Sequence, residues 1–174
     1  MDSKKELSID DYIISVCDLE NFIKISKALD SREVFNLLDD IQILIVNSLL
    51  DLEPVLIKNI GDGNLIIFKK ENVDVKISAL YNLKKEIEAL LKSRGFNTKA
   101  SFSNHYGEVT IGKLGIKPFE SIDAFGESIN TTFVMNGKPF RGRFNISPQL
   151  FRKLDRETRK IFHKYTPQIM YIAD

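Results

Sequence analysis

Two aspartates, Asp18 and Asp62, are placed where their carboxylates can meet and bind a divalent cation. Asp18 directly follows the apolar run at 12–17, which predicts a buried strand. Asp62 lies in a Gly-Asp-Gly turn between the apolar runs at 55–60 and 65–68, a pattern that predicts a hairpin. On neighbouring strands, the two carboxylates would form an all-oxygen site suited to Mg²⁺ or Mn²⁺. Taken singly, Asp18 is better explained as a helix cap and Asp62 as a turn residue.

A lysine, Lys58, interrupts the apolar face that Leu56 and Ile60 form on the second predicted strand. This arrangement has two explanations. Either the strand lies at the edge of a sheet and its lysine reaches solvent, or the ammonium group points into a site. The periodicity of the strand leaves both open.

The composition indicates one globular domain and excludes several kinds of site. The chain has 174 residues, 43% of them hydrophobic and 28% charged, which is typical of globular proteins. With 25 basic and 24 acidic side chains, the net charge is +1, which argues against dedicated nucleic-acid binding. The single cysteine excludes an intramolecular disulfide, and the two histidines lack the spacing of zinc ligands. No apolar run reaches the ~20 residues of a membrane span, so we expect a cytoplasmic protein.

The order of the predicted elements indicates an α+β fold. Helical spacing marks 31–52 and 73–92, and a short helix is expected soon after Asp18. The early order is then strand, helix, strand, strand, helix, strand, which is the ferredoxin-like arrangement, and we expect its first strand to lie beside its second. We expect 1–11 to form a flexible arm and 12–174 to form the domain. The other predicted elements are strands at 98–103, 108–111, 143–146 and 168–172, and helices at 127–135 and 147–162.

Four short motifs follow one another along the chain. They are Asp-Leu-Glu-Asn-Phe at 18–22, Lys-Asn-Ile-Gly-Asp at 58–62, His-Tyr-Gly-Glu at 105–108 and Asp-Ala-Phe-Gly-Glu-Ser-Ile-Asn at 123–130. In this order the motifs resemble those of the class III nucleotidyl cyclase catalytic domain, the adenylate/guanylate cyclase homology domain. The resemblance runs from about Tyr12 to the end of the chain. It implies a ferredoxin-like βαββαβ core with C-terminal additions, and a head-to-tail homodimer with two sites at its interface.

The resemblance also implies roles for residues in the first two motifs. Asp18 and Asp62, with the carbonyl of Leu19, would bind two divalent ions at each site, either Mg²⁺ or Mn²⁺. The backbone amides around three residues would hold the β- and γ-phosphates of a nucleoside triphosphate: Asn21, Phe22 and Ile23. The reaction would be attack of the ribose 3′-hydroxyl on the α-phosphate with release of pyrophosphate, assisted by both ions.

By the same resemblance, the other subunit would complete the site. Lys58 and Asp123 would read the base, and this combination is the adenine-type pair of the family. Asn130 would orient the ribose. Lys164, just before the Tyr-Thr-Pro segment at 165–167, is the candidate for the family's phosphate-binding lysine.

Two positions depart from the family's pattern. Asn21 stands where the family has glycine, and asparagine tolerates the same left-handed backbone. Val134 stands one helical turn after Asn130, where the family has an arginine that stabilises charge in the transition state. Losing one such donor costs about 10²–10³ in rate. The next segment offers three other cations: Lys138, Arg141 and Arg143.

Three functions fit these residues. The first is a homodimeric cyclase that converts ATP to a 3′,5′-cyclic nucleotide, and the Lys58–Asp123 combination favours it. The second is a pyrimidine cyclase of the kind found in bacterial anti-phage signalling, which makes cyclic UMP or cyclic CMP. The third is a degenerate cyclase domain that binds a nucleotide or a partner without turnover, which Val134 suggests.

Overall fold

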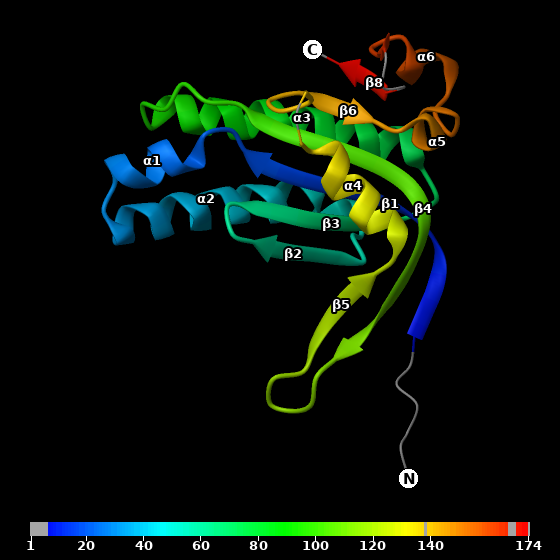
Figure 1. The fold of residues 1–174 in the computed structure, drawn as a ribbon, viewed down its shortest axis with the longest axis horizontal. Helices are drawn as coiled ribbons and strands as arrows, with labels where there is room; N and C mark the ends of the chain where they lie inside the picture. Colours follow the sequence, from blue (N-terminus) through cyan, green and yellow to red (C-terminus); the bar gives the residue numbers. More distant parts are fainter. Residues whose placement is uncertain (1–6, 138, 167–169, 174) are drawn as a thin grey trace.

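A computed structural model describes residues 7–137, 139–166 and 170–173 of the chain, in which one sheet carries helices on both faces (Figure 1). The strands are β1 (Leu7–Leu19), β2 (Leu56–Ile60), β3 (Gly63–Lys69), β4 (Ala100–Leu114), β5 (Ser121–Phe125), β6 (Phe144–Ile146), β7 (His163–Tyr165) and β8 (Met170–Ala173). The helices are α1 (Phe22–Ala28), α2 (Ser31–Leu49), the 3₁₀ turn η1 (Leu50–Leu52), α3 (Val73–Ser93), α4 (Glu127–Met135), α5 (Pro148–Phe151) and α6 (Arg156–Arg159).

The sheet confirms the predicted α+β, ferredoxin-like core. Neighbouring strands run in the order β2-β3-β1-β4-β6-β8-β7, and β5 pairs with β4 outside this path. The prediction that the first strand lies beside the second is wrong. β1 pairs with β3 instead, because β2 and β3 form a hairpin whose second strand lies next to β1. β2 is therefore an edge strand.

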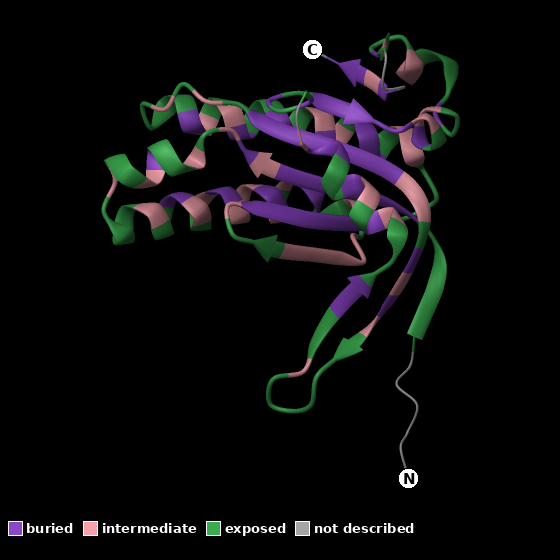
Figure 2. Ribbon diagram, in the orientation of Figure 1, coloured by how far each residue is buried: buried purple, intermediate pink, exposed green. Residues whose placement is uncertain are grey.

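Alternation along the strands divides the buried side chains between the two faces of the sheet, as the pleat requires. Ile13 of β1 lies in the larger cluster, which α1, α2 and α3 cover. Ile14 and Val16 point the other way and pack in a second cluster with Ile129 of α4. The buried strands run through the middle of Figure 2. Asp18, two residues after Val16, belongs to the face that carries α4.

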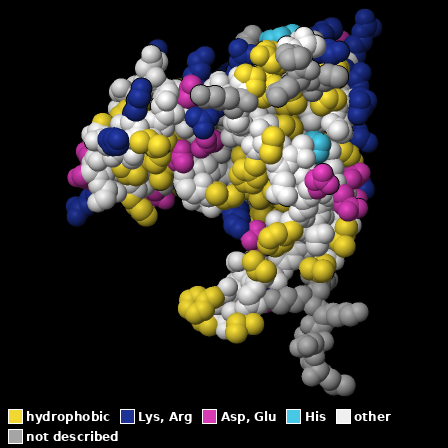
Figure 3. Space-filling view, in the orientation of Figure 1, with side chains coloured by type: hydrophobic (Ala, Val, Ile, Leu, Met, Phe, Trp, Pro, Cys, Tyr) yellow, Lys and Arg dark blue, Asp and Glu magenta, His cyan; other side chains and the backbone are white. Residues whose placement is uncertain are grey.

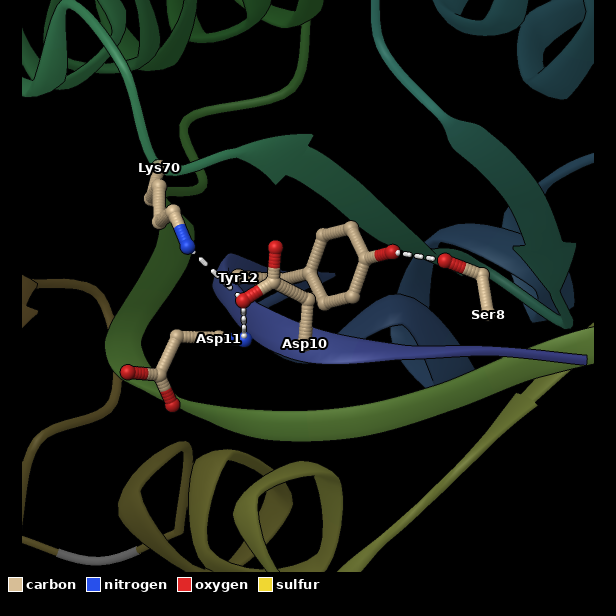
Figure 4. A network of polar contacts seen from close by, with 5 residues as sticks. All are labelled: Ser8, Asp10, Asp11, Tyr12 and Lys70. Atoms are coloured by element: carbon tan, nitrogen blue, oxygen red, sulfur yellow. Dashed lines mark hydrogen bonds and ion pairs between the residues drawn. The ribbon is translucent and has the colours of Figure 1, made fainter.

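The start of β1 differs from the flexible arm expected for 1–11. Residues 1–6 lie outside the described part of the chain, but 7–11 are strand and pair with 108–112 of β4. The Lys70 ammonium lies 2.8 Å from the Asp10 carboxylate beside this strand (Figure 4). A backbone ladder does not depend on apolar side chains, so a charged segment extends the strand once a long partner is available.

β4 is one strand where the sequence predicted two, at 98–103 and 108–111. Residues 105–107 do not interrupt it, because each pairs with a residue of β1. Beyond the ladder with β1, β4 and the unpredicted β5 form a hairpin that projects from the sheet (Figure 1). This hairpin, residues 110–125, is called the β4–β5 arm below.

The C-terminal part departs from the single helix predicted over 147–162. Ser147 caps α5 as expected, but Asp155 caps a second helix by accepting a hydrogen bond from the Thr158 amide (2.7 Å). The chain therefore forms α5 and α6 with a break between them. The predicted final strand is β8, and residues 168–169 of that prediction lie outside the described part. No helix among the described residues is long and apolar enough to cross a membrane.

Candidate active site

The carboxyl groups of Asp18 and Asp62 meet at one end of the sheet. Cys17 pairs with Asn64 across β1 and β3, so Asp18 lies beside the turn that precedes β3 and carries Asp62. Burial, followed by the charge of Asp62 and a hydrogen bond between the two carboxyl groups, raises the pKa of Asp18 to about 6. The second charge on this pair is therefore unfavourable until a cation neutralises it.

Two glycines make this close approach possible. Gly61 has a left-handed backbone (φ +64°), the conformation that turns of this kind favour in glycine. Gly63 lies so close to β1 that a Cβ atom there would overlap the carbonyl oxygen of Cys17. The Gly-Asp-Gly turn thus sets the separation between β3 and β1, and with it the separation of the two carboxylates.

This carboxylate pair fits a divalent ion that shares its coordination shell with a bound substrate. In the described part of the chain, no group of three or more His, Cys, Asp or Glu side chains is arranged to hold a metal. Mg²⁺, however, commonly takes one or two carboxylates and fills its shell with water and substrate phosphates. Asp18 and Asp62 match that pattern, and the Leu19 carbonyl is the next backbone oxygen after Asp18.

Asn21 turns the chain from β1 into α1. Its backbone is left-handed (φ 57°, ψ 29°), as its place in the first motif requires, and its side chain makes no capping hydrogen bond. The interpretation of Asp18 as the cap of this helix is wrong. Asp18 pairs with Ser101 inside β1, and α1 begins only at Phe22.

A pocket of about 500 Å³ opens beside this turn. It is lined by the six residues of the first two motifs that were predicted to hold metal ions or phosphates: Asp18, Leu19, Asn21, Phe22, Ile23 and Asp62. A second pocket, of about 290 Å³, adjoins Asp18 and reaches the end of α4 at Asn136 and Gly137. The structure therefore brings this half of the predicted site together.

Three basic side chains line the larger pocket: Lys24, Lys27 and Arg141. The two lysines were not assigned from the sequence, whereas Arg141 was one of the three cations suggested in place of an arginine at position 134. The two lysines carry a detectable signal, because a spacing of three residues places them on one side of the helix that follows the first motif. Arg141 is 123 positions along the chain from Asp18, and no local pattern connects them.

Lys58 and Asp123 also come together. The Lys58 ammonium lies 2.6 Å from the Asp123 carboxylate, and it joins edge strand β2 to β5. Burial opposes the ionisation of Asp123, but hydrogen bonds from Lys58 and from the Ala124 amide outweigh it, so the pKa of Asp123 lies below its usual value. The first explanation of Lys58 is confirmed, because its strand is an edge. Its ammonium group pairs with Asp123, and its place in a site stays a prediction.

The remaining predicted site residues stand apart from these two groups within one chain. Asn130 is exposed on α4, and the side chain of Val134 one turn later is 80% exposed. Lys164 is exposed on β7 and lines neither pocket beside Asp18. Lys138, one of the other candidate cations, lies outside the described residues.

Comparisons with known proteins agree with this fold and with these motifs. A family model, the adenylate and guanylate cyclase catalytic domain, matches residues 5–170. A search of curated proteins gives no sequence match.

Solved cyclase structures superpose on almost the whole chain. The adenylyl cyclase CyaB from P. aeruginosa is 15% identical with a TM-score of 0.82, over 97% of this chain and 96% of its own. The guanylyl cyclase Cya2 is 15% identical with a TM-score of 0.79, over 95% and 92%. A class III adenylyl cyclase-like ATP-binding protein from Pseudomonas aeruginosa is 14% identical with a TM-score of 0.73, over 91% of this chain and 37% of its own. At these identities the likeness establishes the fold.

Proposed function

The chain belongs to the adenylate and guanylate cyclase catalytic domain family, and from this premise we propose that it converts a nucleoside triphosphate, ATP by preference, into a 3′,5′-cyclic nucleotide and pyrophosphate. The observation that carries the proposal is the meeting of Asp18 and Asp62 in a pocket lined by the first motif. The proposed location is the cytoplasm, where nucleoside triphosphates are available.

Different residues around this pocket bind the metal ions and the phosphates. Asp18 and Asp62 hold two divalent ions, Mg²⁺ or Mn²⁺, with the help of the Leu19 carbonyl. When bound, these ions lower the pKa of the ribose 3′-hydroxyl and neutralise charge on the triphosphate. The 3′-oxygen then bonds to the α-phosphorus, the bond from that phosphorus to the leaving pyrophosphate breaks, and the hydroxyl proton passes to solvent. The amides around Asn21, Phe22 and Ile23 support the β- and γ-phosphates.

Lys58 and Asp123 supply the recognition of the base. The lysine offers donors and the aspartate offers acceptors, and the edge of adenine presents an acceptor beside an amino donor. Their 2.6 Å contact holds both groups in place before a base arrives. Asn130 on α4 is proposed to orient the ribose, and Lys164 to contact the phosphates.

We propose that two copies of the chain share each site. Lys58, Asp123, Asn130 and Lys164 line neither pocket beside Asp18, so one copy does not collect every group that the reaction needs. A surface suited to a second copy is present, because the β4–β5 arm exposes a set of large apolar side chains (Figure 3). They are Leu114, Ile116, Phe119, Ile122 and Phe125. Apolar surface of this kind marks sites of association.

Two other functions remain as outcomes of the test. A pyrimidine also presents one donor and one acceptor to the Lys58–Asp123 pair, and would make the chain a source of cyclic UMP or cyclic CMP. A domain that binds nucleotide without turnover is favoured by Val134, which places an exposed apolar side chain where the family has a catalytic arginine.

The test is a product assay with ATP, GTP, UTP and CTP supplied separately, with Mg²⁺ and then with Mn²⁺. We expect a cyclic product and pyrophosphate in equal amounts, from ATP before the others. Asp62→Ala should abolish both, whereas Asp39→Asn, a change at an exposed carboxylate of α2, should leave them unchanged. Nucleotide binding without any cyclic product would favour the domain that does not turn over.

A further inference from the structure

Among the described residues of the segment between α4 and β6, Arg141 is the one that lines both pockets adjoining Asp18. Asp18, the first carboxylate of the pair, also lines both pockets. Through these two pockets, Arg141 lies on the same side of the site as the carboxylate pair, within a single copy of the chain.

The backbone on both sides of Arg141 is fixed. Phe140 is buried, and its amide donates to the carbonyl of Gly137 (2.9 Å). The Phe140 ring also packs edge to face on Tyr165, with 5.3 Å between the ring centroids. Gly142 has a left-handed backbone (φ +72°), and its amide donates to the Ser101 hydroxyl (2.6 Å). The backbone at position 141 is therefore held beside the pockets by Phe140 and Gly142, which are both fixed in place.

The side chain of Arg141 is exposed and keeps its charge available. Among the described residues it forms no ion pair with an acidic side chain. The acidic groups nearby are Asp18, Asp62 and Glu20. The carboxylate of Glu20 lies against Gly142.

The same pocket therefore combines two acidic side chains with three basic ones, Lys24, Lys27 and Arg141. These cations do not help to bind a divalent ion alone, because like charges repel. A metal–polyphosphate complex uses both kinds of group, because the carboxylates bind its metal and the cations bind phosphate oxygens that face away from the metal. Arginine suits this second task, since its planar fork bonds two phosphate oxygens at once.

We propose that Arg141 binds the triphosphate of the nucleotide whose metal ions Asp18 and Asp62 of the same chain hold, and so supplies a cation to a site that has Val134 in place of an arginine. This inference rests on the proposed function, which identifies the ligand as a nucleoside triphosphate. It differs from the family's pattern in the residue that carries the charge, because Arg141 lies in the segment after α4 and not on α4 itself.

The test measures binding of inorganic pyrophosphate with Mg²⁺ by calorimetry, a probe that carries no base or ribose. We expect Arg141→Ala to weaken binding about tenfold or more, the usual effect of losing a hydrogen bond to a charged group. Arg141→Lys should recover part of the loss. Arg156→Ala is the matched control, because Arg156 is also an exposed arginine and lines neither pocket. Equal affinities for Arg141→Ala and the unchanged protein would overturn the inference.

The same proteins, assayed for cyclic product, separate this inference from the proposed function. Pyrophosphate binding that depends on Arg141 in a chain without turnover would support the inference and contradict the cyclase activity. Cyclic product formed equally by Arg141→Ala and by the unchanged protein, at limiting nucleotide, would support the cyclase and overturn the inference.

Discussion

Lys58 and Asp123 form an ion pair at 2.6 Å between two strands that are not neighbours in the sheet. β2 is an edge strand next to β3, whereas β5 pairs only with β4 among the described strands. The contact therefore depends on the β4–β5 arm, which places Asp123 beside β2 although the two strands do not pair. A base reader made of these two groups is assembled by the tertiary fold, and neither strand supplies it alone.

Replacing Lys58 should damage recognition of the nucleotide and spare recognition of its phosphates. We expect Lys58→Ala to raise KM for ATP about tenfold, as for a hydrogen bond lost from a charged group, and to leave Mg²⁺–pyrophosphate affinity unchanged. Steady-state kinetics and calorimetry measure the two effects. Lys70→Ala, which removes the Asp10 ion pair on β1, is the control and should change neither. A fall in pyrophosphate affinity for Lys58→Ala would place this lysine at the phosphates instead.

Asp18 should reduce the stability of the metal-free protein. Its pKa rises from 3.8 to about 6 on folding. Its ionisation therefore lowers the free energy of unfolding progressively from about pH 4 to about pH 6, and by a constant amount above that. Asp18→Asn should therefore raise the free energy of unfolding at pH 7 by about 1 kcal/mol, a figure reduced from the full shift because solvent screens a half-buried group. Below pH 4 the two proteins should coincide.

Thermal unfolding in EDTA across this pH range tests the prediction for Asp18. Asp39→Asn, at an exposed carboxylate, should show no such gain. Saturating Mn²⁺ should reverse the order of stability, since only the unchanged protein keeps both carboxylates. An Asp18→Asn variant that is less stable than the unchanged protein at pH 7 in EDTA would contradict the account of this pair.

Sequence could predict the part of this site that depends on the backbone preferences of individual residues. Asn21 in the left-handed region and the Gly-Asp-Gly turn both follow from backbone preferences of single residues. The helix cap at Asp30 is equally local, and its capping box with Glu33 is present as the residue types suggest.

What sequence could not predict depends on partners far along the chain. Residues 7–11 are strand because β4 is long enough to pair with them, and their own charges give no sign of it. β5 has only five residues and exists as the second half of the arm. Arg141 lines the same pockets as Asp18, and the segment that carries it is anchored on Ser101 of β4. Each of these features follows from the assembled sheet.

Gly63 offers a test of the geometry that brings the two aspartates together. A methyl group there would overlap the Cys17 carbonyl, so Gly63→Ala should push β3 away from β1 and cost about 1–3 kcal/mol of stability. Metal affinity should fall as well, because the carboxylates separate. Gly95→Ala is the control: its backbone is left-handed (φ +86°) but its surroundings are open, so it should lose stability and keep its metal affinity. Unchanged metal affinity in Gly63→Ala would refute this role of the turn.

Val134 lies one helical turn from Asn130, and both side chains are exposed on α4. By the resemblance of its motifs, position 134 is the one at which we propose that an arginine would stabilise transition-state charge. We expect Val134→Arg to raise kcat about tenfold or more, since one donor of this kind is worth 10²–10³ at best. Val134→Met, which adds length without charge, should leave kcat unchanged. An equal kcat for Val134→Arg and the unchanged protein would mean that this position does not face the reacting phosphate.

The central claim is that two copies of the chain together form one cyclase site, with Asp62 from one copy and Lys58 from the other. Mixing two impaired variants, assayed at limiting ATP, tests it most directly. A dimer of Asp62→Ala with Lys58→Ala holds one site in which both residues are intact, so random mixing should restore about a quarter of the unmixed, unchanged protein's activity by the symmetry of the pair. Asp62→Ala alone should stay near zero, and Lys58→Ala alone should keep about a tenth of the activity, as its tenfold higher KM requires. No recovery on mixing, with mixed dimers demonstrated by mass spectrometry, would contradict the shared site.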